Sequence, residues 1–362
     1  MSYRRLMLAA IAGFILAGNA VAQETNRQYR FVAGDDAYTL ELVDVPMPTA
    51  GPGEVLVRVR ATSLNRRDLM MLNNRYGAPG SADGGIPLSD GAGEVIAVGA
   101  NVTRFAVGDR VAGIFFADWI DGKRDAAALA SARGGGPTGM LAEVIVADEA
   151  SLVGIPDHLT FEQAATLPCA GVTAWVGLFR HGRLQANDYV LLEGTGGVST
   201  FGLVFSAAAG ARPIITSSSK EKLGQARELG AFGTANYREN EDWQDEVRAL
   251  TGDRGVDHVL EVGGQDTLEK ALEALGYDAH IALIGGLSGF APAIPVGTMM
   301  GLGTRATGIY VGSRADFEAM NAFIEEHRIE PAIGRVFSFD EAPAAFDFME
   351  NGSYFGKIVI RH

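Results

Sequence analysis

The chain has 362 residues, of which 44 are acidic and 30 basic, so its formal net charge is −14. This length allows two domains with full hydrophobic cores. The acidic balance, without a basic stripe or a base-stacking motif, argues against a nucleic-acid partner. The single cysteine excludes an intramolecular disulfide.

The first 22 residues have the organisation of a secretory signal peptide. Arg4 and Arg5 precede an apolar run over 6–17, and residues 20–22 read Ala-Val-Ala before Gln23. We predict export to the periplasm of a mature chain that starts at Gln23 and keeps no stable membrane span. A cytoplasmic protein with a start codon assigned too early is the alternative. The arginine pair also resembles a twin-arginine signal, so the export route stays open.

Two patterns follow along the chain. Residues 28–150 consist of short β-type runs separated by glycine, which is typical of an antiparallel, barrel-like unit. Between about 170 and 312, strand-type runs alternate with helical segments, and this alternation indicates a parallel, doubly wound sheet. The tail returns to a helix and then to a strand that ends at Arg361. The predicted fold class is therefore α/β.

A glycine-rich turn lies at the start of the alternating region. The strand-type run 188–193 leads into Gly194-Thr195-Gly196-Gly197-Val198-Ser199, and a helical segment follows at once. Glycines give a tight turn and let backbone N–H groups approach a pyrophosphate at the helix N-terminus. We therefore predict that Gly194, Gly196, Gly197 and Val198 bind a dinucleotide, with Ser199 in place of the third glycine. An ordinary strand–helix loop is the alternative.

The next strand-type run, 211–216, leads into Ser217, where an NAD-selective site would place an acidic residue. The hydroxyls of Ser217 and Ser218 and the ammonium of Lys222 can instead donate hydrogen bonds to a 2′-phosphate. We therefore predict that NADP(H) is preferred over NAD(H). The serines also suit the cap of the following helix, and both roles can coexist.

Taken together, six segments resemble the medium-chain dehydrogenase/reductase superfamily, in its zinc-free quinone-reductase and alcohol-dehydrogenase-like branch. In order they are 61–69, 88–95, 107–111, 165–174, 194–198 and 356–359. The resemblance implies a GroES-like β-barrel catalytic domain formed by 28–169 and 314–362, and a Rossmann NADP-binding domain over 170–313. It also implies a substrate cleft between the two domains and a homodimer.

The resemblance assigns further residues to the cofactor. Thr173 matches a position beside the nicotinamide. The positions that match strand ends or the tail and line the dinucleotide are Tyr237, Gly263, Gly264, Gly285, Ser313 and Lys357. Ordinary turn glycines and, for Lys357, a surface lysine are the alternatives.

Zinc-dependent relatives coordinate their catalytic metal with a cysteine, a histidine and a further cysteine or acidic residue. The matching positions here hold Asn65, Ser89 and Cys169, with Asp90 beside Ser89. Asparagine and serine are poor zinc ligands, and one cysteine cannot hold the ion alone. We therefore predict no zinc and no other metal.

Without a metal ion, the protein must polarise the substrate oxygen by hydrogen bonding and supply a proton after hydride transfer. We predict that the Asn65 amide donates to that oxygen and that Asp68, if desolvated, takes part in proton transfer. A solvated ion pair of Arg67 with Asp68 is the alternative. The expected function is a zinc-independent NADP(H)-dependent oxidoreductase that acts on an alcohol/aldehyde, quinone or enone. An exported NADP(H)-binding carrier or sensor without turnover is the rival hypothesis.

Overall fold

The computed structural model describes residues 25–76, 83–136, 138–290, 295–352 and 354–362. The predicted signal peptide, residues 1–22, lies outside the described residues. Among the helices of the described part, none is long and apolar enough to cross a membrane.

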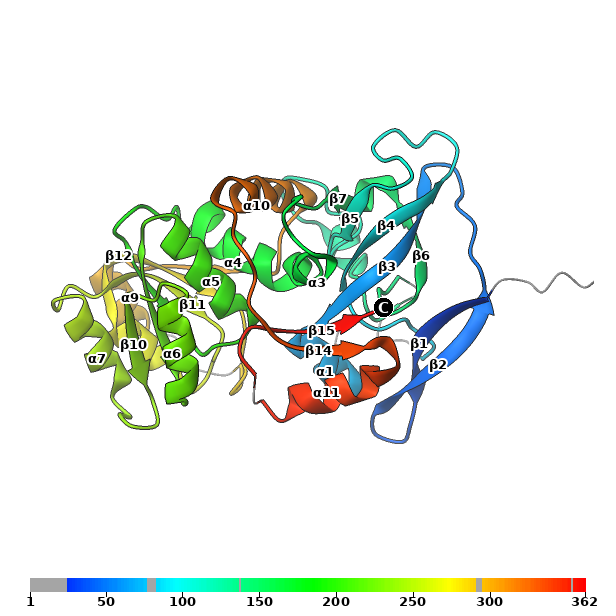
Figure 1. Cartoon of the computed structure of the whole chain (residues 1–362). Coiled ribbons are helices and arrows are strands. Elements are labelled where there is room, and N and C mark those ends of the chain that lie inside the picture. The colour runs from blue at the N-terminus through cyan, green and yellow to red at the C-terminus, as the bar shows by residue number, and fades with distance from the viewer. Residues whose placement is uncertain (1–24, 77–82, 137, 291–294, 353) are drawn as a thin grey trace, which may run out of the picture.

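A six-stranded parallel sheet forms one half of the molecule (Figure 1), with the strand order β10-β9-β8-β11-β12-β13. Val190, Leu191 and Leu192 in β8 have no exposed surface, as expected for a parallel strand covered on both faces. The strands are β8 (Tyr189–Leu192), β9 (Arg212–Ser217), β10 (Gly233–Asn236), β11 (Val256–Glu261), β12 (Leu275–Leu283) and β13 (Arg305–Gly308).

Helices connect consecutive strands of this sheet. They are α5 (Gly197–Ala208), α6 (Lys220–Glu228), α7 (Trp243–Leu250), α8 (Leu268–Glu273) and α9 (Val296–Leu302). The sequence order runs outward from β8 on both sides, so the direction of winding reverses between β8 and β11. This is the doubly wound arrangement that the strand–helix alternation predicts.

The other half contains a seven-stranded sheet in which most neighbouring pairs are antiparallel, as in β3–β4, β3–β6 and β4–β5. Its strands are β3 (Glu54–Leu64), β4 (Asp90–Val98), β5 (Arg110–Gly113), β6 (Val144–Asp148), β7 (Leu152–Gly154), β14 (Ile333–Ser338) and β15 (Lys357–Arg361). A hairpin of β1 (Thr25–Ala33) and β2 (Tyr38–Pro46) forms a separate two-stranded sheet beside it. The predicted α/β fold, with a GroES-like unit beside a Rossmann-like sheet, is confirmed.

Short helices surround this second sheet and link it to the first. They are α1 (Arg66–Leu72), α2 (Ala126–Ala130), α3 (Phe161–Ala164), α4 (Val172–Trp175), α10 (Arg314–His327) and α11 (Ala342–Glu350). The first half of α5 and the strand β15 both contribute to one apolar core, in which Phe201, Leu192 and Val359 are buried. The two halves therefore share part of their hydrophobic core.

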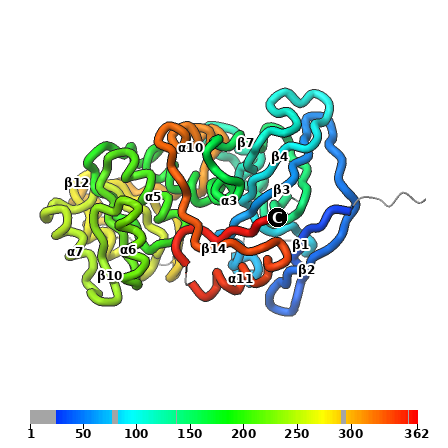
Figure 2. The backbone as a smooth tube through the Cα atoms, viewed as in Figure 1, coloured from blue at the N-terminus to red at the C-terminus, as the bar shows by residue number. Residues whose placement is uncertain are grey.

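The C-terminal segment connects the two sheets directly. In Figure 2 the last, red part of the tube lies between the two halves. Strand β15 pairs with β3, and Gly356, just before it, forms a β-bridge with Gly196. The N–H of Gly356 donates to the carbonyl of Thr195 at 2.9 Å. The glycine turn is thereby fixed against the strand that carries Lys357.

Candidate active site

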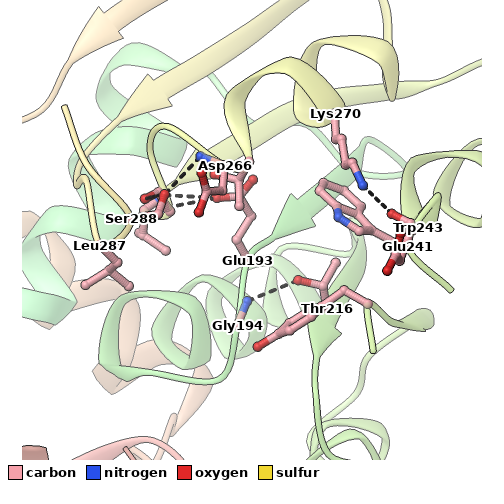
Figure 3. A pocket seen from close by; sticks show the side chains of 13 residues that line it. Glu193, Gly194, Thr216, Glu241, Trp243, Asp266, Lys270, Leu287 and Ser288 are labelled. Atoms are coloured by element: carbon pink, nitrogen blue, oxygen red, sulfur yellow. Dashed lines mark hydrogen bonds between the residues drawn. The ribbon is translucent and has the colours of Figure 1, made fainter. Parts of the chain in front are cut away.

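A pocket of about 510 Å³ lies at the carboxyl ends of β8, β9 and β11 (Figure 3). This is the crevice beside the point where the winding reverses, and open parallel sheets bind their ligands there. The residues that line the pocket are Glu193, Gly194, Thr216, Tyr237, Glu241, Trp243, Val262, Gly263, Asp266, Thr267, Lys270, Leu287 and Ser288.

Of the cofactor residues predicted from the sequence, Gly194, Tyr237 and Gly263 line this pocket. Sequence reasoning missed Thr216, although it directly precedes Ser217; its hydroxyl accepts a hydrogen bond from the N–H of Gly194 at 3.2 Å. It also missed Trp243, which the sheet brings to the pocket from α7 without any fixed spacing to the glycine turn.

The glycine turn has the geometry that an anion site requires. Gly194 has φ +69°, in the left-handed region that favours glycine. Helix α5 begins at Gly197, where no described side chain caps it, and a Cβ added to Gly196 would meet no atom of the described residues within 4 Å. The first N–H groups of a helix have no intrahelical partner, so those around Val198 can receive a pyrophosphate.

The end of β9 is arranged around three consecutive serines. Ser217 is buried, and its hydroxyl accepts a hydrogen bond from the N–H of Ser219 at 3.3 Å. Ser219, not Ser217, caps α6 by accepting from the N–H of Lys222 at 3.3 Å. The ammonium of Lys222 donates to the carbonyl of Gly352 at 3.4 Å. Ser218, which lies between these two serines in the sequence, is half-buried.

Four further residues that were predicted to contact the cofactor also lie outside the pocket lining. Gly264 has φ +92° in the loop after β11, and Gly285 follows β12. Thr173 is buried in α4. Ser313 caps α10, and its hydroxyl bonds Asp316. Contact of these four residues with a cofactor stays a prediction.

A second polar cluster lies where β3, β4 and β15 approach the glycine turn. Lys357 has only 3% exposure, so the surface-lysine alternative is wrong. Its ammonium donates to the carbonyl of Leu64 at 2.7 Å and to Oδ1 of Asn65 at 2.6 Å. The same ammonium lies 3.5 Å from the carboxylate of Asp90. A Cβ on Gly197 would meet the Lys357 stem at 2.6 Å, so the lysine runs directly beside the turn.

This contact fixes the direction of the Asn65 amide. An ammonium group can only donate, so the amide oxygen must face Lys357 and Nδ2 must face away. Nδ2 is buried and has no hydrogen-bond partner among the described residues. Buried polar atoms are nearly always satisfied by a partner. The structure therefore presents an oriented N–H donor that lacks its acceptor.

Asp68 stabilises the start of α1, where Asn65 lies, from within the protein. Its carboxylate accepts a hydrogen bond from the N–H of Asn65 at 2.7 Å and lies 3.6 Å from the guanidinium of Arg67. The Asp68 and Arg67 side chains are 0% and 9% exposed, so the alternative of a solvated pair is wrong. Burial raises the pKa of Asp68 to about 6, although Arg67 opposes this shift.

Two family matches cover most of the described chain. Residues 51–157 match the alcohol dehydrogenase GroES-like domain family, and residues 197–326 match the zinc-binding dehydrogenase family.

Sequence and structure comparisons agree with these matches. A zinc-type alcohol dehydrogenase-like protein of Schizosaccharomyces pombe is 39% identical, over 91% of this chain and 96% of its own. A quinone oxidoreductase of Pseudomonas aeruginosa is 33% identical, over 88% and 94%. The structure of a Sinorhizobium meliloti 1021 protein assigned to the alcohol dehydrogenases superposes with a TM-score of 0.87 at 40% identity, over 94% and 99%. That of an NAD-dependent alcohol dehydrogenase gives 0.84 at 30% identity, over 93% and 99%.

The relatives include both alcohol dehydrogenase-like proteins and quinone oxidoreductases, and they align with nearly the whole length of this chain. The chain belongs to the medium-chain dehydrogenase/reductase superfamily and is an oxidoreductase of the alcohol dehydrogenase and quinone oxidoreductase type.

Proposed function

We propose that the protein is a zinc-independent oxidoreductase that transfers hydride between NADP(H) and an alcohol/aldehyde, quinone or enone. The observation that carries this proposal is the Asn65 amide, which Lys357 orients and which has no acceptor within the described part of the chain. A substrate oxygen is the acceptor that this geometry suits. The nicotinamide supplies hydride when bound, and the residues of the chain position and polarise the substrate.

The residues fit a dinucleotide. The uncapped start of α5 and the open space beside Gly196 suit a pyrophosphate, and the pocket between β8, β9 and β11 suits the adenosine half. In the mechanism, Asn65 donates to the substrate oxygen and stabilises the negative charge that develops on it during reduction. The Asp68 carboxyl has no exposure, and its contacts are the backbone N–H of Asn65 and the guanidinium of Arg67, which do not relay protons. We therefore assign it the positioning of Asn65, and its part in proton transfer stays a prediction.

The residues do not fit a catalytic zinc. Ser89 donates to Asp90 at 2.7 Å, and the N–H of Cys169 donates to the other oxygen of that carboxylate at 3.2 Å. The Lys357 ammonium already supplies a positive charge to Asn65 and Asp90. Burial raises the pKa of the Cys169 thiol, which disfavours the thiolate that zinc requires. The proposed mechanism uses no metal ion.

We propose NADP(H) as the preferred cofactor, from the absence of a carboxylate at Ser217. Ser217→Asp is expected to shift the ratio of NADPH to NADH affinity about 100-fold toward NADH, because adjacent like charges cost several kcal/mol. Binding titrations with both cofactors measure this ratio. Ser219→Asp is the matched control, since aspartate keeps the cap of α6. An unchanged ratio in Ser217→Asp would show that the 2′-position lies elsewhere.

A measurement of turnover distinguishes the proposed enzyme from the rival hypothesis of a carrier or sensor. NADPH binding together with hydride transfer to at least one carbonyl, quinone or enone in a substrate panel supports the enzyme. Tight NADPH binding without transfer to any member supports the carrier. The Asn65 donor favours the enzyme, because a carrier has no use for an N–H group that is oriented by the lysine beside the glycine turn.

Export and dimerisation are also proposed. Among the described strands, the edge strand β13 pairs only with β12. The segment that connects β12 to β13 carries exposed apolar side chains, those of Leu287, Val296 and Met300. Native mass spectrometry of the protein from its natural host tests both proposals at once. We expect two copies that each begin at Gln23. A retained Met1 would contradict export, and a single copy at micromolar concentration would contradict the dimer.

A further inference from the structure

Two buried glutamates lie behind the proposed dinucleotide site. Glu193 ends the run of β8 and directly precedes Gly194, while Glu261 is the last residue of β11. They are 5% and 1% exposed. The register of the parallel strands β8 and β11 places Leu192 beside Leu260, so the two glutamates that directly follow these residues lie side by side. Two neighbouring carboxyl groups can hydrogen-bond to each other only if one of them carries a proton.

Each glutamate also holds a cofactor loop. One Glu193 oxygen accepts hydrogen bonds from the N–H groups of Val262 and Gly263, both at 3.2 Å. One Glu261 oxygen accepts from the N–H of Gly264 at 2.7 Å and from the hydroxyl of Thr267 at 2.7 Å. The other oxygen of each glutamate, Oε1 of Glu193 and Oε2 of Glu261, is buried and has no hydrogen-bond partner among the described residues.

The backbone of Glu193 is fixed as well. The hydroxyl of Ser199, in the first turn of α5, donates to its carbonyl at 2.6 Å. The pair therefore joins the glycine turn and the start of α5 on one side to the loop after β11 on the other. Both segments line the pocket, through Gly194 and through Val262 and Gly263.

Burial raises the pKa of Glu193 well above its usual range, and the adjacent Glu261 raises it further. The other titratable or charged groups that line the same pocket are Tyr237, Glu241, Asp266 and Lys270. The Lys270 ammonium donates to the carbonyl of Glu241.

We propose that Glu193 and Glu261 share one proton and act as positioning residues, which hold the glycine turn and the β11 loop at the separation that the cofactor needs. This inference rests on the proposed dinucleotide function. When the proton is lost, two buried carboxylates face each other without a cation between them. Their repulsion separates the two loops, and cofactor affinity falls as the pH rises.

Glu193→Gln tests the shared proton, because glutamine keeps the carbonyl acceptor for Val262 and Gly263. Its amide carries N–H donors at every pH and can donate to the Glu261 side chain without a shared proton. The measurement is the Kd of NADP⁺ between about pH 6 and 9, followed by protein fluorescence with Trp243 in the pocket wall. Taking the ratio of wild type to variant cancels the titration of the cofactor and of other protein groups. Glu228→Gln, at an exposed position on α6, is the matched control.

We expect the ratio of wild-type to Glu193→Gln Kd to rise with pH, by up to about tenfold per pH unit, the limit for one proton. Glu228→Gln should follow the wild type. Glu261→Gln makes the same bonds in the opposite direction, so the ratio of wild-type to Glu261→Gln Kd should rise with pH in the same way. Either variant tests the inference if the other fails to fold. If both glutamine variants follow the wild-type pH profile, the positioning role is wrong.

Thermal unfolding without cofactor separates this inference from the proposed function. A group whose pKa is raised by folding stabilises the protein below its unfolded pKa, and this contribution is lost as the pH rises through the folded value. Wild type should therefore lose stability relative to Glu193→Gln toward high pH. If this occurs but neither NADP⁺ nor NAD⁺ binds, the shared proton is supported and both the dinucleotide function and the positioning role fail.

Discussion

Asn65→Asp is expected to lower kcat by about 100- to 1,000-fold, the usual cost of removing one hydrogen-bond donor to a developing oxyanion. Aspartate has nearly the same shape and keeps an oxygen for the Lys357 ammonium, which lies 2.6 Å from Asn65 Oδ1. It replaces the donating Nδ2 with an acceptor that repels the substrate oxygen. Steady-state kinetics on any substrate that the wild type reduces will measure the effect.

Binding and stability measurements assign this loss to chemistry. The NADPH Kd and the unfolding temperature of Asn65→Asp should stay close to wild type. Asn65 lies at the start of α1, where its N–H donates to Asp68, and it does not line the pocket. Lys357→Met removes the ammonium that sets the direction of the amide while keeping a long side chain. We expect a smaller loss of kcat, because the freed amide can still adopt the donating orientation. Wild-type kcat in Asn65→Asp would contradict the role of Asn65.

The glycine turn was predictable because its parts are adjacent in the sequence. The strand β8, the turn and α5 follow one another without interruption, and a left-handed residue such as Gly194 is a local requirement. The doubly wound sheet was predictable for the same reason, since its strands and helices alternate along the chain. Local patterns of this kind carry their own structural signal.

Contacts between distant segments were not predictable from the residues alone. Lys357 reaches Asn65 across 292 positions, and only the pairing of β15 with β3 brings them together. The Glu193 and Glu261 pair likewise depends on the adjacency of β8 and β11. In the sequence each glutamate appears as the polar end of an apolar strand. Neither spacing nor composition indicates that the two carboxyl groups meet.

Gly197→Ala is expected to destabilise the protein by about 1–3 kcal/mol, the usual cost of adding a methyl group to a packed interior. The new Cβ would lie 2.6 Å from Cδ of Lys357 and 3.1 Å from the Cβ of Ala170. The lysine cannot move aside freely, because its ammonium is held by Leu64 and Asn65. Displacement of Lys357 should therefore also lower kcat. Chemical denaturation and steady-state kinetics measure the two effects.

The neighbouring Gly196→Ala variant is the matched control, because the two positions differ in what surrounds them. A Cβ on Gly196 meets no protein atom within 4 Å and its φ is −79°, so we expect a stability change of no more than about 1 kcal/mol. The same Cβ would project into the space proposed for the pyrophosphate, so NADPH affinity should fall while kcat at saturating cofactor is retained. For Gly197→Ala we expect the reverse, namely that stability and kcat fall more than NADPH affinity does. Equal effects of the two substitutions would contradict the separation of a cofactor face, at Gly196, from a lysine-packing face, at Gly197.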